Sequence, residues 1–162
     1  MKVAVVMGSK SDMPVLEKTL KVLKDFGVEA VPRILSAHRT PGQAHEFAAG
    51  AESAGIEVII AAAGKAAHLA GVLAAYTVLP VIGLPIKSST LDGLDSLLSI
   101  VQMPAGIPVA TVALDGGENA GLLAVQILAV KYPELNVKLK AYKKQMEENV
   151  MKANSEWLEE LK

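Results

Sequence analysis

Leu35-Ser36-Ala37-His38-Arg39-Thr40-Pro41 is the stretch that decides the fold, because it joins two contrasting sequence patterns. Residues 28–34 before it are typical of a strand, and residues 43–54 after it have the amphipathic pattern of a helix. His38 and Arg39 are therefore expected on a turn at the carboxyl end of a strand, the edge where open α/β sheets bind ligands. A titratable imidazole beside a fixed positive charge favours proton transfer on an anionic small molecule.

The same alternation of strand and helix continues along the chain. Strands are predicted over residues 2–7, 28–34, 58–62, 80–84 and 108–114. Helices are predicted over residues 13–26, 43–54, 69–76 and 94–101, and a further one begins within 115–119 and ends near 130. This order predicts an α/β fold, a flavodoxin-like three-layer sandwich with a five-stranded parallel sheet and right-handed crossovers. Because no repeat or linker interrupts the pattern, residues 1–162 are expected to form one domain.

The composition excludes several classes of protein. The net charge is -1 at pH 7, so no overall field attracts nucleic acid or an anionic membrane. Without cysteine the chain has no disulfide, thiol nucleophile or thiolate metal site. The apolar runs are short, and the first residues lead directly into a strand, so neither a membrane span nor a secretory signal is expected. We therefore expect a cytoplasmic protein.

Residues 134–162 follow a different pattern, in which apolar side chains recur every three or four positions. This spacing predicts one long C-terminal helix with a single apolar stripe, formed by Leu135, Leu139, Tyr142, Met146, Val150, Ala153, Trp157 and Leu161. Such a helix would extend roughly 40 Å, which exceeds the width of a domain of this size. The stripe either packs on another copy of the chain or follows its own domain and frays. The first arrangement is favoured, and it predicts a homo-oligomer.

The segment Gly8-Ser9-Lys10-Ser11-Asp12 lies between the first predicted strand and the first predicted helix. A glycine lets a ligand approach the backbone, and the free N–H groups at the start of a helix attract an anion. Asp12 is available to a ribose hydroxyl. The alternative is that Ser11 or Asp12 only caps the helix. The segment lacks the dinucleotide-binding glycine pattern. Gly64-Lys65 does not form a phosphate-binding P-loop either, because Ala66 follows it and Ile59 stands where the first glycine should be.

The three histidines fall in separate segments, without a metal-binding spacing, so no metal site is expected. His38 carries an imidazole, the side chain suited to proton transfer near neutral pH, and Arg39 offers a forked donor to phosphate or carboxylate. His68 lies in an apolar stretch and is open to either a functional or a structural role. His45 lies within the second predicted helix and is expected to be solvated. Gly64 and the alanines around it form either a narrow pocket or a close helix–sheet contact.

Taken together, four motifs resemble one family over nearly the whole chain. They are Val6-Met7-Gly8-Ser9-Lys10-Ser11-Asp12, Ser36-Ala37-His38-Arg39-Thr40-Pro41, Ala66-Ala67-His68-Leu69 and Asp95-Ser96-Leu97-Leu98-Ser99-Ile100-Val101-Gln102-Met103-Pro104. The sequence resembles the N5-carboxyaminoimidazole ribonucleotide mutases of purine biosynthesis, which are related to the aminoimidazole ribonucleotide carboxylases. The resemblance implies an octamer with active sites where subunits meet, and neither a cofactor nor a metal.

The resemblance also implies the roles of individual residues. Ser9, Asp12 and Arg39 would bind the ribose phosphate of the nucleotide, and His38 would be the catalytic acid and base. The remaining substrate-binding residues implied are Gly8, Ser36, Ala37, Gly64, Lys65, His68 and Leu69. The carbamate would leave the exocyclic nitrogen as CO2, and ring carbon C4 would attack the trapped CO2 while His38 moves the proton. A small, dry pocket suits this step.

The chain departs from the family pattern at three positions, where Ala62, Lys65 and Ala70 replace glycine, glycine and proline. Lys65 adds a cation and a side chain close to the expected CO2 pocket. The alternative activity is therefore a carboxylase that uses free CO2 and the uncarboxylated nucleotide. A non-enzymatic flavodoxin-like module, such as a phospho-receiver or a flavin carrier, is a distant alternative. A receiver would need an acidic residue where the chain has Ala62 and Ala63, and a flavin carrier usually has more aromatic residues.

Overall fold

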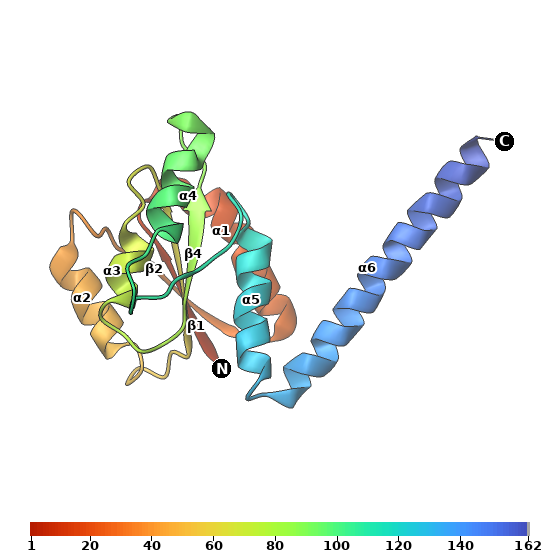
Figure 1. Ribbon diagram of the computed structural model, residues 1–162. Helices are drawn as coiled ribbons and strands as arrows, with labels where there is room; N and C mark the ends of the chain where they lie inside the picture. The colour runs from red at the N-terminus through yellow and green to blue at the C-terminus, as the bar shows by residue number, and fades with distance from the viewer. Residues whose placement is uncertain (162) are drawn as a thin grey trace.

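The computed structural model describes residues 1–161, which fold around a sheet of parallel strands (Figure 1). The strands are β1 (Lys2–Met7), β2 (Glu29–Ile34), β3 (Val58–Gly64), β4 (Val81–Ile86) and β5 (Ala110–Thr111). Their order in the 5-stranded sheet is β2-β1-β3-β4-β5. The predicted flavodoxin-like α/β architecture is thereby confirmed, including the long helix at the carboxyl end of the chain.

Helices cover both faces of the sheet (Figure 1). One face carries α1 (Met13–Phe26) and α5 (Gly117–Ala129), and the other carries α2 (Pro41–Gly50), α3 (Leu69–Ala74) and α4 (Leu94–Val101). Alternate side chains of β1 separate into the two cores, because Val3 and Val5 pack on the α1–α5 side whereas Ala4 and Val6 pack on the other. Aliphatic residues fill both cores, in keeping with a sheet buried on both faces.

Two strands are longer than the sequence predicts. β3 continues to Gly64, and β4 continues to Ile86 rather than ending at Leu84 before a proline. Pro85 is tolerated because its backbone faces the β5 side, where its carbonyl accepts a hydrogen bond from the Asp115 N–H at 2.9 Å. β5 ends before it reaches the level of Pro85. No β5 carbonyl there needs a hydrogen bond from a backbone N–H at position 85.

Three elements end earlier in the structure than the sequence predicts. β5 comprises only Ala110–Thr111 instead of residues 108–114. Pro108, which precedes the strand, has no backbone N–H to donate, and the chain turns at Asp115 (φ 54) beyond its end. α2 ends at Gly50 instead of 54, because residues 51–55 turn at Gly55 (φ 77) to bring the buried Ile56 back toward β3. α3 likewise ends at Ala74 rather than 76.

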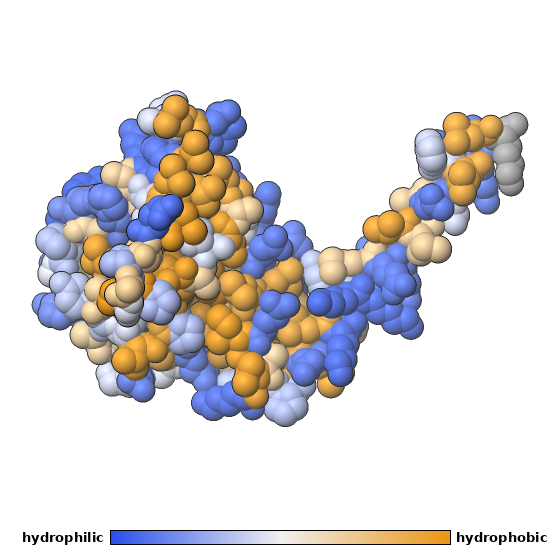
Figure 2. All heavy atoms as spheres, in the orientation of Figure 1, coloured by the Kyte–Doolittle hydropathy of each residue, from blue (hydrophilic) through white to orange (hydrophobic). Residues whose placement is uncertain are grey.

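Helix α6 (Pro133–Glu160) is 28 residues long and projects away from the sheet (Figure 1). Leu135 and Leu139 are buried where it leaves α5, and residues 143–161 are all exposed. Figure 2 shows apolar side chains at intervals along this helix among charged ones. Beyond Tyr142 the helix therefore does not pack on its own sheet and helices. Within residues 1–161, no helix combines the length and the hydrophobicity that crossing a membrane requires.

Candidate active site

A pocket of about 630 Å³ opens at the carboxyl edge of the sheet, among the loops that follow β1, β2, β3 and β4. Strand register creates it, because Met7 is level with Ile34 and Gly64 is level with Ile86, so the four loops begin at similar heights. Every candidate binding or catalytic residue singled out in the sequence lines this pocket: Gly8, Ser9, Asp12, Ser36, Ala37, His38, Arg39, Gly64, Lys65, His68 and Leu69. The pocket therefore lies at the edge of the sheet that the sequence predicts to bind a ligand.

The loop after β1 is held by its own side chains. A short 3-10 helix, η1 (Lys10–Asp12), begins after Ser9, whose backbone N–H donates to Asp12 Oδ2 at 3.1 Å. Ser9 Oγ in turn accepts hydrogen bonds from the Ser11 N–H at 3.3 Å and the Ser11 hydroxyl at 2.9 Å. This reciprocal capping shows that Ser9 and Asp12 cap the helix and also line the pocket. The two alternatives for this segment are therefore compatible.

Asp12 is only 7% exposed, which is unusual for a carboxyl group. Burial raises the pKa of Asp12, and hydrogen bonds from the Ser9 N–H and the Ser11 hydroxyl partly oppose this shift. The carboxyl group is thus fixed in orientation beside the pocket. A carboxyl group held in this way can accept a hydrogen bond from a ligand hydroxyl without first being ordered.

His38 and His68 meet in the pocket although they belong to separate loops. His38 Nε2 lies 2.9 Å from His68 Nδ1, and the two rings are nearly perpendicular at 73°. One ring must donate a proton to this contact and the other must accept it, so the tautomers of the two histidines are linked. Both side chains are exposed rather than packed in the core. His68 is therefore part of a polar pair at the pocket, which favours the functional interpretation of it.

Arg39 connects the loops that follow β1 and β2. Its Nη2 donates to the Gly8 carbonyl at 3.1 Å, and its Nε donates to Ser36 Oγ at 3.4 Å. The turn itself is closed by Thr40, whose N–H donates to the Ser36 carbonyl at 2.9 Å. The guanidinium group has five N–H donors, so several stay available to an anion in the pocket.

Comparison with known proteins places the chain in a family. Residues 2–149 match the sequence model of the family described as "AIR carboxylase". The chain belongs to this family. This match confirms the family that the four motifs predict.

Relatives in this family include a protein of Pyrococcus abyssi that is 63% identical over 145 residues, covering 90% of this chain and 83% of that protein. A relative from Thermotoga maritima is 55% identical over 150 residues, covering 93% of this chain and 88% of that protein. Both are named N5-carboxyaminoimidazole ribonucleotide mutase. The crystal structure of Treponema denticola PurE is similar to the structure, with a TM-score of 0.85 and 30% identity, covering 96% of this chain and 97% of that one.

Sequence reasoning assigned no role to the loop after β4, yet it forms one wall of the pocket. Lys87, Ser88 and Ser89 line it beside the end of β3. Ser88 Oγ donates to Asp95 Oδ1 at 3.1 Å, which ties the loop to the start of α4. The sequence feature that indicates a role for this loop is its position directly after a strand, at the edge of the sheet expected to bind a ligand. Ser11, Ala63, Ala66 and Ile86 complete the lining.

Lys65, one of the departures from the family pattern, has a φ of 57°. This left-handed conformation is natural for the glycine that the pattern has there and is strained for a lysine. Gly64 is closely packed, because a Cβ atom there would lie 3.3 Å from the Ile86 carbonyl oxygen, which would have to shift slightly. The loop thus keeps a glycine-like backbone while carrying a cationic side chain.

The third histidine lies outside the pocket. His45 is on α2, exposed, and its ring centroid is 4.2 Å from that of Tyr76 after α3. It is exposed, as expected, and its ring also contacts that of Tyr76. Within residues 1–161, no three histidine, aspartate or glutamate side chains come together as metal ligands.

Proposed function

We propose that the protein isomerises N5-carboxyaminoimidazole ribonucleotide to 4-carboxy-5-aminoimidazole ribonucleotide in purine biosynthesis. The observation that carries this proposal is the His38–His68 pair beside Arg39 in the pocket of a chain 63% identical to a protein named for that activity. An arginine that can bind an anion and a titratable pair in the same pocket are what a proton transfer on a phosphorylated substrate needs.

The proposed mechanism uses His38 as acid and then as base. The bond between the exocyclic nitrogen and the carboxyl carbon breaks, CO2 is released within the pocket, and His38 donates a proton to the nitrogen. Ring carbon C4 then attacks CO2 to form the new carbon–carbon bond, and His38 removes the proton from C4. The substrate thus gains one proton and loses one, so no net proton is exchanged. The contact with His68 at 2.9 Å orients the imidazole for both transfers.

The rest of the pocket would hold the nucleotide and the CO2. We assign Arg39 and Ser9 to the phosphate, and the buried Asp12 to a ribose hydroxyl. Gly64 and the alanines beside it leave a narrow surface with few polar groups, which would hold CO2 next to C4 and limit its escape. None of these residues has to change its protonation state, so proton transfer depends on the histidines.

A second candidate activity has one observation in its favour, the description of the matching family as "AIR carboxylase". In that reaction free CO2 adds to C4 of the uncarboxylated nucleotide, and His38 only removes the C4 proton. The pocket would serve both reactions. They differ in whether the carboxyl group arrives bound to the nucleotide.

We also propose that the protein is a homo-oligomer, an octamer, in which residues 134–162 pack on a neighbouring subunit. The stripe expected to form the contact includes Val150, Trp157 and Leu161, which are 69%, 59% and 64% exposed. Large apolar side chains repeated along a projecting helix are typical of an interface between chains.

The two activities are separated by following a labelled carboxyl group. The protein is incubated with nucleotide that carries ¹³C in the N5-carboxyl group, in the presence of excess unlabelled bicarbonate, and products are read by NMR. Isomerisation gives the C4-carboxylated nucleotide with its label retained. A carboxylase gives unlabelled product and also acts on the uncarboxylated nucleotide with bicarbonate. If neither the labelled nor the unlabelled C4-carboxylated nucleotide forms, both candidate activities are contradicted.

A further inference from the structure

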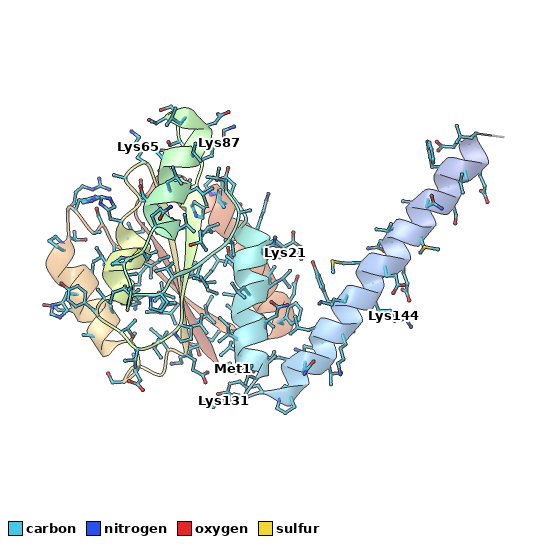
Figure 3. The ribbon with its side chains drawn as sticks, in the orientation of Figure 1. Met1, Lys21, Lys65, Lys87, Lys131 and Lys144 are labelled. Carbon is cyan, nitrogen blue, oxygen red and sulfur yellow. The ribbon has the colours of Figure 1, made fainter. Side chains whose placement is uncertain are left out.

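Two lysines stand next to each other at the rim of the pocket, and the mechanism above uses neither. Gly64 and Ile86 are partners in the register of β3 and β4, and Lys65 and Lys87 are the residues that follow them. Neighbouring strands are about 4.8 Å apart, so the backbones of the two lysines are close. Both residues line the pocket, and Figure 3 shows both at the same edge of the molecule.

The backbone around this lysine pair is strained. Lys65, Asp92 and Asp115 have φ values of 57°, 56° and 54°, a region that residues with a side chain rarely adopt. Lys65 is one member of the lysine pair, and the two aspartates contact the other member. The Asp92 carboxylate lies 3.1 Å from Lys87 Nζ, and Asp115 Oδ1 accepts a hydrogen bond from the Lys87 backbone N–H at 2.8 Å. Strain of this kind persists where the surrounding structure imposes it, and it gathers at functional sites.

The lysine pair lies across the pocket from Arg39. Arg39 follows β2, and the sheet order β2-β1-β3-β4 puts two and three strand spacings between it and the lysines. These spacings correspond to about 10 and 14 Å. His38 comes from the loop after β2 and His68 from the loop after β3, so their contact joins the loop that carries Arg39 to the loop that carries Lys65. The pocket is therefore lined by cationic side chains from the β2 side and from the β3–β4 side.

A ligand that matches this arrangement carries an anion at each end. We infer that Lys65, together with Lys87, binds the carboxylate of the nucleotide and makes the protein prefer the carboxylated nucleotide over the uncarboxylated one. This inference rests on the proposed function, with Arg39 at the phosphate end. Within residues 1–161 Lys65 forms no ion pair, so its charge is available. Lys87 is paired only with the exposed Asp92, a contact of little strength that a ligand can replace.

Two variants of Lys65 test the inference. Lys65→Asn removes the charge with a residue that tolerates the left-handed conformation, and Lys65→Arg keeps the charge. Calorimetric titration with the C4-carboxylated nucleotide should show that Lys65→Asn weakens binding by about tenfold or more, as expected for a lost hydrogen bond to a charged group. Binding of the uncarboxylated nucleotide should stay within about twofold, and Lys65→Arg should retain most of the preference. Lys18→Asn, an equal loss of charge on the exposed side of α1, should change neither affinity.

The outcomes separate this inference from the proposed function. If the unaltered protein isomerises the nucleotide and Lys65→Asn binds both nucleotides as the unaltered protein does, the inference is wrong and the proposed function stands. Equal weakening for both nucleotides also overturns it, because the lysine would then recognise the phosphate or the overall charge. If the unaltered protein neither converts nor binds the carboxylated nucleotide, the proposed function fails and the carboxylate subsite fails with it.

Discussion

Replacing His38 with asparagine tests whether its imidazole moves the proton in the proposed reaction. A positioned acid or base contributes about 10²–10⁴-fold to the rate, so kcat should fall by at least about a hundredfold. The substitution also disturbs the hydrogen bond to His68 at 2.9 Å. An intramolecular hydrogen bond of this type contributes about 0.5–1.5 kcal/mol. Because 1.4 kcal/mol corresponds to about tenfold, binding of the nucleotide should weaken by no more than about tenfold.

The assay measures kcat from formation of the C4-carboxylated nucleotide and measures Kd separately by calorimetry. His45→Asn is the matched control, because it makes the same exchange on an exposed histidine outside the pocket and should change neither quantity. If His38→Asn loses binding by far more than tenfold, His38 is an anchor for the nucleotide and not the group that transfers the proton. Retention of kcat would also refute the reasoning.

Three further predictions concern stability and assembly. Gly83→Ala should lower the free energy of unfolding by about 1–3 kcal/mol in urea titrations, since a Cβ atom there would collide with Ile100, whereas Gly42→Ala meets nothing and should not be destabilised. Asp12→Asn should raise the melting temperature at pH 7, because burial raises the pKa of Asp12 and ionisation of the buried carboxyl group therefore lowers the stability of the native state. The gain in melting temperature should shrink as the pH falls through the pKa of the folded protein, and it should vanish below the ordinary value of 3.8. Truncation after Tyr142 should lower the oligomeric state in analytical ultracentrifugation while leaving the sheet folded, and an unchanged assembly would contradict the role proposed for α6.

The sequence predicts the fold because each element carries its own local signal. The aliphatic runs of β1 and β3 and the spaced leucines of α1 are readable without any neighbour. The ends of elements are less predictable because they depend on neighbouring strands. Pro85 indicates the end of a strand locally, but it lies inside β4 because the adjacent strand has already stopped. β5 is shorter than its apolar residues favour, because Pro108 precedes it and the chain turns at Asp115 after it.

The candidate site is predicted to a similar degree and for a similar reason. His38, Arg39 and the Gly8 loop were placed at the carboxyl edge of a parallel sheet, and that edge forms the pocket. The contact between His38 and His68 required the order of β2 and β3 in the sheet, which no local pattern contains. The left-handed backbone of Lys65 was equally hidden, because the residue type argues against it. Roles in binding and catalysis stay predictions until the variants are measured.

The fluorescence of Trp157 reports on the surroundings of α6. It is the only tryptophan in the chain, and its side chain is 59% exposed on the outer half of α6, far along the helix from the sheet. Intrinsic tryptophan emission therefore senses the surroundings of that helix and says nothing about melting of the strands. A blue shift on concentrating the sample would mark the indole leaving water, while the unfolding of the sheet has to be followed by far-ultraviolet circular dichroism.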